Sequence, residues 1–201
     1  MASAAVALAL GAGCGGGTRQ DAGEARASYP VAVPLATFPA RQSLAQRSEL
    51  RIAVRNAGTR TIPNVAATIE AARRGTTVEA FAGPAEAANV QSSSRPVWVI
   101  EDGPVNGETA GANTWALGSL RPGATKTFVW RVAAVRAGRF QVTYRLSGSL
   151  TGRSRLRLSD RGAQRSAAGA VPHGSFTVSV SGRPVQTQVR PDGTIVTVPG
   201  T

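Results

Sequence analysis

TKTFVWRVAAVRAGRFQVTYRL, residues 125–146, is the stretch that decides the fold. It consists of two longer segments, Thr125–Val135 and Arg139–Leu146, joined by the short turn Arg136–Gly138. Every second residue of the two longer segments is apolar: Phe128, Trp130 and Val132, then Phe140, Val142, Tyr144 and Leu146. Successive side chains of a strand point to opposite faces, so each segment predicts a strand with one buried face. The short turn between the segments predicts an antiparallel hairpin.

The same alternation recurs on both sides of this stretch. It marks five further strands, at 48–56, 65–70, 96–101, 155–158 and 175–181. The proline-punctuated segment 30–39 suits an edge strand, and two short strands are expected in the tail around Pro191-Asp-Gly193. No window keeps a helical period for more than two turns. About seven or eight short strands separated by turns predict an all-β, immunoglobulin-like antiparallel β-sandwich.

One such domain is expected over residues 29–201, with a long inserted loop at 71–113. The insertion is rich in Gly, Ala, Ser and Asn, and only 96–101 is expected to form a strand within it. Residues 147–173 are rich in Ser, Arg and Gly and are expected to be flexible apart from 155–158. Long loops on a rigid sandwich are frequent sites of function.

Several motifs resemble those of bacterial CARDB-type immunoglobulin-like modules. They are Leu50–Gly58 with its Asn-x-Gly turn, Ile62-Pro-Asn-Val65, the Leu120-Arg-Pro-Gly123 turn before a Thr-rich strand, and the strand start Ala137-Gly-Arg-Phe140. The likeness covers about residues 45–146. It implies an immunoglobulin-like fold and a role in adhesion, spacing or accessory binding. Because each motif marks a turn, the motifs say little about a ligand.

The N-terminus resembles the signal peptide of a bacterial lipoprotein. Residues 2–17 carry no charge and contain the only cysteine, Cys14, followed by three glycines. The resemblance implies that residues 1–13 are removed and that lipidated Cys14 anchors the chain at the outer face of the cytoplasmic membrane. Residues 14–28 would then be a flexible tether. A secretory signal without lipid and an alanine-rich N-terminus of no consequence are the alternatives.

The chain is strongly basic, with a formal net charge of +12 carried almost wholly by arginine. A GC-rich coding bias, as in actinobacteria, would favour arginine, and so would contact with anionic lipids or acidic wall polymers. The second hypothesis places polyanion contacts at Arg153, Arg155 and Arg157. Nucleic acid is disfavoured as a partner, because the arginines are scattered over many strands and no nucleic-acid motif is present.

Residues suited to catalysis are scarce. The only histidine, His173, stands in Pro172-His-Gly174, and a hydrolase would have to combine it with Asp160 or Asp192 without a Gly-x-Ser-x-Gly elbow. One histidine, one cysteine and one methionine are too few for a zinc or copper site. The sequence therefore predicts no enzymatic activity and no cofactor.

Two features leave ligand binding open. Glu101, Asp102, Asn106 and Glu108 offer oxygen ligands of the kind that calcium prefers, although a polar turn is the favoured interpretation. Trp115 and Trp130 are expected in the core. A core position is also favoured for Trp98, but an outward Trp98 beside Glu101 and Asp102 would resemble a sugar-stacking platform.

Together these features predict a lipid-anchored cell-envelope protein that acts as a non-catalytic adhesion or interaction module. Its partner would be an envelope protein or an anionic wall polymer. A carbohydrate-binding module using Trp98 and the acidic loop is the alternative, and a hydrolase using His173 is a third. An exposed edge near residues 30–40 also leaves pairing with another chain open.

Overall fold

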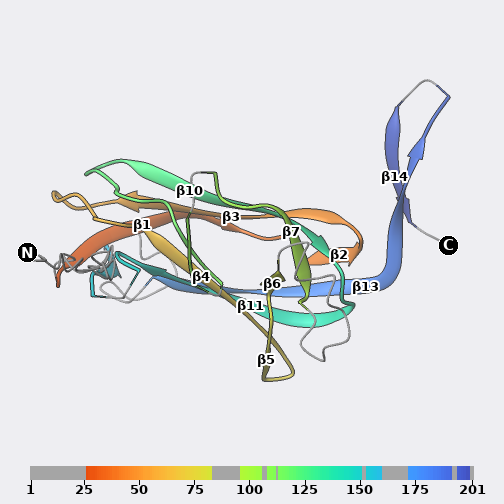
Figure 1. Ribbon diagram of the computed structural model, residues 1–201, viewed down its shortest axis with the longest axis horizontal. Helices are drawn as coiled ribbons and strands as arrows, with labels where there is room; N and C mark the ends of the chain where they lie inside the picture. The colour runs from red at the N-terminus through yellow and green to blue at the C-terminus, as the bar shows by residue number, and fades with distance from the viewer. Residues whose placement is uncertain are drawn as a thin grey trace, which may run out of the picture.

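The computed structural model describes residues 26–82, 96–105, 108–111, 113–150, 153–159, 172–191 and 194–199. These residues form two β-sheets packed face to face, with no helix among them (Figure 1). The chain is an immunoglobulin-like β-sandwich, which confirms the fold class predicted from the alternating segments.

The first sheet has six strands in the order β12-β1-β3-β10-β7-β6. In that order they span Arg155–Leu158, Ser28–Thr37, Arg47–Asn56, Thr125–Ala134, Trp98–Asp102 and Phe81–Ala82. The four central strands pair antiparallel, whereas β12 and β6 lie parallel to their neighbours at the two edges.

The second sheet has the order β14-β13-β11-β4-β9-β8. In that order the strands span Ile195–Pro199, His173–Val189, Gly138–Ser147, Ala66–Arg73, Thr114–Ala116 and Glu108–Gly111. Two short strands lie off this path: β2 (Arg41–Leu44) pairs parallel with β13, and β5 (Thr76–Val78) pairs antiparallel with β4.

The apolar faces of the two sheets meet in one core. Its central side chains are at most 1% exposed: Leu50, Ile52, Val54, Phe128, Trp130 and Val132 from the first sheet, and Ile69, Phe140, Val142, Leu146 and Val178 from the second. Aromatic rings fill the middle, with ring centroids 5.5 Å apart in both Phe128–Trp130 and Trp115–Trp130. Burying each such side chain contributes about 1.5–3 kcal/mol, so packing between the sheets is a main source of stability.

The predicted hairpin at 125–146 is wrong, because its two strands belong to different sheets. β10 pairs with β3 and β7, whereas β11 pairs with β4 and β13. The chain crosses between the sheets after Ala134, and the Val135 N–H donates to the carbonyl of Val97 at 2.9 Å. Gly138 begins β11 at φ +146°, where a Cβ would lie 3.2 Å from the Phe140 ring. The alternation of apolar residues does not distinguish a hairpin within one sheet from two strands in different sheets, since each strand buries one face in either arrangement.

β12 covers β1 only along Ser28–Val31, so the later part of β1, residues 32–37, pairs with β3 alone and is an edge, as expected for the proline-punctuated segment 30–39. The prolines of this segment are accommodated by an irregularity. The register between β1 and β3 shifts between Ala32 and Leu35, where Pro34 cannot donate a backbone hydrogen bond. β12 confirms the strand expected at 155–158 and pairs Ser28 with Arg155.

The range 71–113 is mostly strand where it is described, rather than a loop with one strand. β4 continues to Arg73, and β5, β6, β7 and β8 follow, of which β7 confirms the strand expected near 96–101. Arg74 and Gly75 turn the chain from β4 to β5 at φ +51° and +82°. The insertion thus extends both sheets at their edges.

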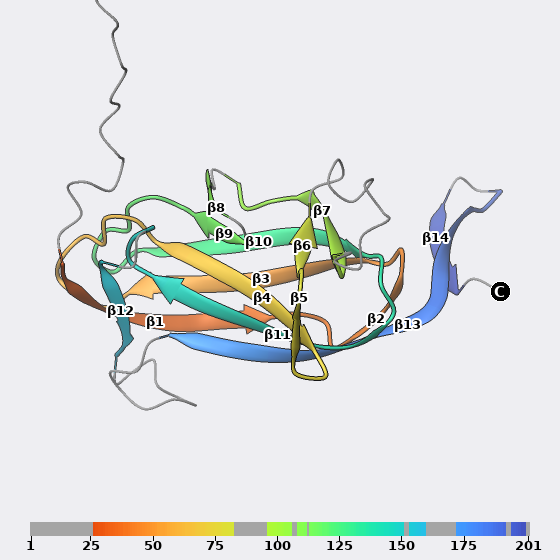
Figure 2. The same cartoon turned by 60° about the horizontal axis from the view of Figure 1, so that its bottom comes forward.

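The tail forms the expected pair of strands, although the first is a continuation of β13. β13 runs from His173 to Val189 and pairs antiparallel with β14. Figures 1 and 2 show this hairpin leaving the sandwich at the end opposite the start of β1.

Asn56, at the end of β3, fixes a corner of the sandwich at the end opposite the β13–β14 hairpin. This corner is the turn from Asn56 to Arg60. Its side chain is buried, its Nδ2 donates to the carbonyls of Arg60 (2.8 Å) and Leu120 (3.0 Å), and its Oδ1 accepts from the Gly58 N–H (2.9 Å). A Cβ on Gly58 would lie 2.9 Å from Pro30 Cγ, so this glycine permits a close approach to β1. The Asn-x-Gly motif therefore brings Arg60 back beside the start of β1.

Candidate functional site

Trp98 is a core residue. Its side chain is fully buried, and its Nε1 donates to Gln42 Oε1 at 2.7 Å. Its ring lies 5.2 Å from Phe38, 6.0 Å from Phe81 and 5.8 Å from Phe140, measured between centroids. The outward orientation that a sugar-stacking platform requires is therefore not found, because the indole completes the aromatic core and satisfies its N–H internally.

Glu101 and Asp102 lie at the exposed end of β7, where each meets an arginine. Arg47 Nε lies 2.9 Å from Glu101 Oε2, and Arg131 Nη1 lies 3.0 Å from Asp102 Oδ2. Arg131 also contacts Glu49 at 3.1 Å. The two acidic residues thus belong to an ion-pair network on the outer face of the first sheet.

This network is electrostatically balanced and exposed. The hydrogen bond that Arg131 donates to Glu49 is the main reason why the pKa of Glu49 lies below its ordinary value, and the same bond is the main reason why the pKa of Arg131 is raised. Exposed ion pairs contribute little to stability, typically below about 1 kcal/mol. Asn106 lies outside the described residues. Within the described ranges no three His, Cys, Asp or Glu side chains come together as a possible metal site.

Arg155 and Arg157 project from β12, the edge strand of the first sheet. Within this strand, exposed arginines alternate with buried Leu156 and Leu158. Arg153, which is also exposed, lies two residues before the strand begins. The leucines attach the strand to the core, so the arginines are presented on a fixed backbone. At about 3.3 Å per residue, neighbouring arginines of this set are spaced roughly 6–7 Å apart along the strand.

Ser28, the first residue of β1, is the point on which further arginines converge. Arg157 Nε donates to Ser28 Oγ at 3.0 Å, and Arg60 Nη2 donates to the Ser28 carbonyl at 3.3 Å. Arg60 also lies over the Tyr29 ring, with its Cζ 5.2 Å from the centroid. Arg26 is exposed two residues before Ser28. Figure 2 shows β12 at the end of the sandwich where β1 begins.

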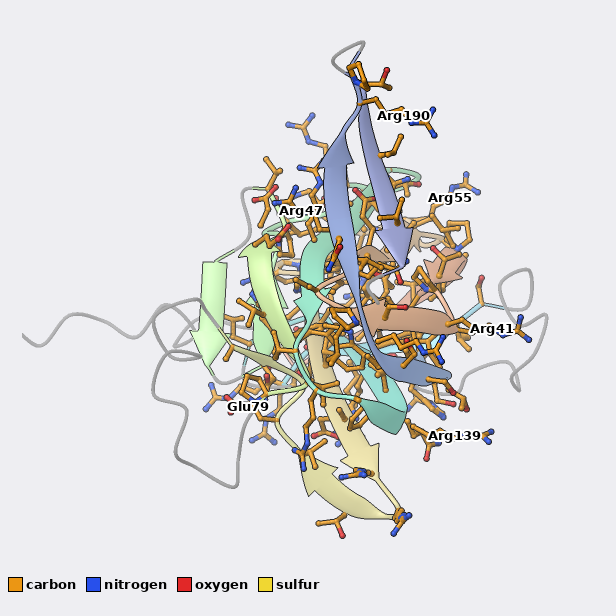
Figure 3. All side chains as sticks on the ribbon, turned by 90° about the vertical axis from the view of Figure 1, so that its right-hand side faces the viewer. Arg41, Arg47, Arg55, Glu79, Arg139 and Arg190 are labelled. Carbon is orange, nitrogen blue, oxygen red and sulfur yellow. The ribbon has the colours of Figure 1, made fainter. Side chains whose placement is uncertain are left out.

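We call Arg26, Arg60, Arg155 and Arg157 the basic rim. Sequence reasoning proposed Arg155 and Arg157 from their local clustering, together with Arg153. It missed Arg60, which is 95 residues from Arg155 in the chain and joins the rim only through the Asn56 corner. Other arginines, such as Arg41, Arg47 and Arg139, project on different sides of the molecule (Figure 3).

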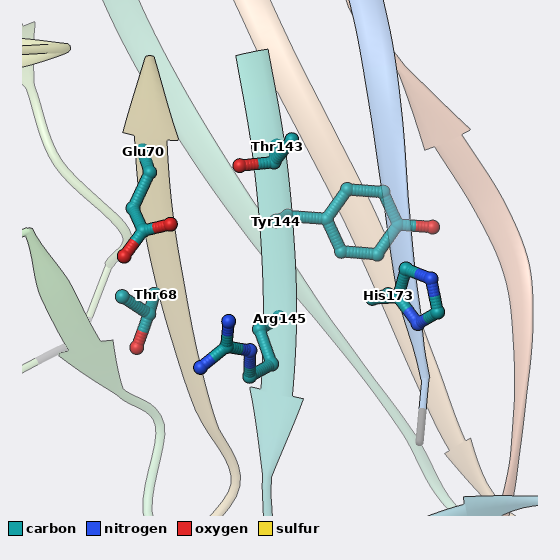
Figure 4. Close-up of a pocket in the computed structure, with 6 residues that line it drawn as sticks. All are labelled: Thr68, Glu70, Thr143, Tyr144, Arg145 and His173. Carbon is teal, nitrogen blue, oxygen red and sulfur yellow. The ribbon is translucent and has the colours of Figure 1, made fainter. Parts of the chain in front are cut away.

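A hollow of about 630 Å³ lies on the second sheet (Figure 4). It is lined by Thr68 and Glu70 of β4, Thr143, Tyr144 and Arg145 of β11, and His173 of β13. The strand register sets Thr68, Arg145 and His173 in one cross-strand row and Glu70 beside Thr143 in the next. His173 is therefore the exposed first residue of β13 rather than a loop residue.

Tyr144 and Gly174 shape the edge of this hollow. A Cβ on Gly174 would lie 2.5 Å from Tyr144 Cε1, so the tyrosine ring occupies the space that a side chain at 174 would need. Burial raises the pKa of the Tyr144 hydroxyl. The hollow offers hydroxyls, a guanidinium and a carboxylate, which suit hydrogen bonding to a polar ligand. Among its hydroxyls, Thr68 Oγ1 is hydrogen-bonded to Thr114 Oγ1 at 2.9 Å.

Sequence reasoning treated Thr143 and Arg145 as an ordinary solvated strand face and did not associate them with His173 or Glu70. The local signal was only the alternation of polar residues at 68 and 70 and at 143 and 145. Which strands are neighbours is a property of the topology. Cys14, Asp160 and Asp192 lie outside the described residues. In the described part of the chain no helix is long and apolar enough to cross a membrane.

No family model and no curated protein matches this chain. Among solved structures, a CARDB domain from Pyrococcus furiosus, crystallised with di-metal ions, is similar at 12% identity and TM-score 0.39, covering 76% of this chain and 86% of that one. Alpha-2-macroglobulin of Escherichia coli is similar at 15% identity and TM-score 0.42, covering 79% of this chain and 7% of that one. A β-glucosidase from Listeria innocua is similar at 11% identity and TM-score 0.39, covering 77% and 16%. At these values the similarities assign no activity to this chain.

Proposed function

We propose that this chain is a lipid-anchored cell-envelope protein whose β-sandwich is a non-catalytic module that binds an anionic partner. The observation that carries the proposal is the position of the basic rim. The rim surrounds Ser28, the residue at which the chain arriving from Cys14 enters the sandwich. The anchor and the basic surface therefore belong to the same end of the domain.

The anchor is supported by the N-terminal sequence. Residues 2–13 are uncharged and end at the only cysteine of the chain. Glycines follow Cys14 directly, and Gly-rich segments behave as flexible linkers. Two acyl chains on one cysteine would hold the module at the membrane, because stable anchoring takes two membrane-binding signals.

The absence of a catalytic role is supported by the surroundings of His173. The described side chains that share its hollow are two threonines, a tyrosine, a glutamate and an arginine. The Thr68 hydroxyl shares a hydrogen bond with Thr114, on the side of β4 away from β11 and His173. The described side chains of the hollow therefore fit hydrogen bonding better than nucleophilic catalysis.

Binding of an anionic partner is supported by the charge around Ser28. Arginine binds phosphate and carboxylate through several donors in a fixed plane. Arg155 and Arg157 of the basic rim present such donors on β12. The carbohydrate alternative lacks this kind of support, since buried Trp98 offers no exposed ring.

Intact-mass analysis of the membrane fraction tests the anchor. We expect the native chain to have the mass of residues 14–201 plus a diacylglycerol group on Cys14. A Cys14→Ser variant should lose both the lipid and the cleavage before residue 14. An unprocessed wild-type chain in the soluble fraction would refute the anchor. A cleaved but unlipidated chain would support the secretory alternative instead.

A further inference from the structure

The basic rim consists of four exposed arginines, three of which are placed by hydrogen bonds or by strand register. Arg60 and Arg157 both donate to Ser28, and Arg155 is the register partner of Ser28 on β12. Arg26 extends from the segment that leads into β1. Arg60 and Arg157 therefore meet at Ser28, and the backbones of Arg26 and Arg155 lie close to it.

Acidic residues of the described part of this sheet lie elsewhere. They are Glu49, Glu101 and Asp102, and each is already in contact with an arginine outside the rim. Glu49 precedes Asn56 by seven positions on β3, which is roughly 23 Å at the rise of a strand. These three carboxylates therefore form their ion pairs with arginines outside the rim.

The length of chain before the sandwich limits where the rim can be. Cys14 precedes Ser28 by fourteen residues. A segment of this length reaches at most about 50 Å when fully extended. A flexible linker with this number of residues would have a root-mean-square length of about 20 Å. A lipid on Cys14 would thus keep the basic rim closer to the membrane than the β13–β14 hairpin at the other end of the sandwich (Figure 2).

We propose that the basic rim docks the sandwich against anionic phospholipid headgroups, which points the β13–β14 hairpin away from the membrane. This inference names the anionic partner of the proposed function and rests on the anchor for its orientation. Each basic residue near an anionic surface strengthens binding about fivefold. Tethering raises the effective concentration of the rim at the surface, so a weak contact becomes a persistent one.

The test uses the full chain carrying Cys14→Ser, so that binding reports the rim rather than the lipid. Co-sedimentation is measured with vesicles of phosphatidylglycerol and phosphatidylcholine, and with vesicles of phosphatidylcholine alone, across a range of NaCl concentrations. We expect binding to the anionic vesicles only, with an affinity that falls as salt rises. Adding Arg155→Gln and Arg157→Gln should lower the affinity by about 25-fold, from two fivefold losses.

Two variants serve as controls. Arg139→Gln with Arg190→Gln removes the same charge from the opposite end, where both side chains are exposed, and should leave the affinity nearly unchanged. Arg155→Lys with Arg157→Lys keeps the charge and should retain most of the binding, which separates electrostatics from damage to β12. Thermal unfolding of each variant checks that the sandwich is intact.

Three results would overturn the inference. Equal losses in the rim and control variants would assign binding to net charge alone. Equal binding to both vesicle types would exclude headgroup charge. Rim-dependent binding to soluble polyphosphate without binding to anionic vesicles would instead assign the rim to a phosphate-bearing polymer. None of these results depends on whether Cys14 is lipidated in cells, which the intact-mass experiment decides separately.

Discussion

Replacing Trp98 by phenylalanine should destabilise the fold more than the same replacement at Trp130. Both indoles are fully buried, but only Trp98 Nε1 has a described hydrogen-bond acceptor, Gln42 Oε1 at 2.7 Å. Trp130 Nε1 is buried and has no acceptor among the described residues. The two substitutions therefore remove similar apolar volume and differ in one hydrogen bond.

The difference can be estimated from Gln42, which is 4% exposed. Trp98→Phe leaves the Gln42 Oε1 atom without its donor, and a buried polar group left unpaired costs about 1–3 kcal/mol. Trp130→Phe removes a donor that was already unpaired, so only packing is lost. In a domain of this size 1 kcal/mol corresponds to roughly 2–4 °C, which predicts a melting temperature about 2–12 °C lower for Trp98→Phe than for Trp130→Phe.

Thermal unfolding gives the melting temperatures and urea unfolding gives the free energies, both followed by far-ultraviolet circular dichroism, because tryptophan fluorescence itself changes in these variants. A double-mutant cycle of Trp98→Phe with Gln42→Met isolates the hydrogen bond, and we expect a coupling energy of about 1 kcal/mol or more. Equal destabilisation by the two tryptophan variants, together with a coupling near zero, would refute the assignment of this hydrogen bond to fold stability.

Three further predictions concern the corner and the hollow. Gly174→Ala should cost about 1–3 kcal/mol by forcing a Cβ into the Tyr144 ring, whereas Gly103→Ala, with open space around it, should be nearly neutral in the same denaturation assay. Tyr144→Phe should reduce the loss of stability above pH 10. The raised pKa of the buried hydroxyl gives stability that is complete below the unfolded-state value and falls as pH rises, and thermal melts from pH 7 to 11 measure it. Asn56→Ala should cost at least about 2 kcal/mol by unpairing buried groups such as the Leu120 carbonyl, and a calorimetric melt little changed from wild type would contradict this.

Much of the strand content could be predicted from sequence, because burial of one face imposes a period of two. β3, β10, β11 and the first part of β13 follow the expected alternation closely. The insertion was harder, since β5 and β6 are only three and two residues long. Strands this short do not contain enough residues to display a period.

Strand partners could not be predicted in the same way. The segments β10 and β11 are adjacent in sequence and carry the strongest alternation, yet they lie in different sheets. The prolines of β1 predict an edge, which holds for residues 32–37, but β12, more than a hundred residues away in the chain, covers the first four residues, Ser28–Val31. Partner choice depends on which apolar faces can meet across the whole molecule, and local pattern carries no information about this.

The candidate site likewise combines residues that the sequence predicts with residues that only the fold brings beside them. Local sequence identified Cys14, and it identified Arg153, Arg155 and Arg157 as a basic group. Only the folded chain adds Arg60 to that group. The same holds for Trp98, for which the sequence left a core position and a surface platform open.

The sequence by itself determined that this protein is a β-sandwich with a basic surface, because side-chain polarity and strand period are local properties of the chain. The tertiary structure decided which strands pair, that Trp98 is enclosed, and that the basic rim lies where the chain enters the sandwich. These features depend on contacts between distant segments. Such contacts form only when the two apolar faces pack together and the backbone hydrogen bonds of each strand find partners.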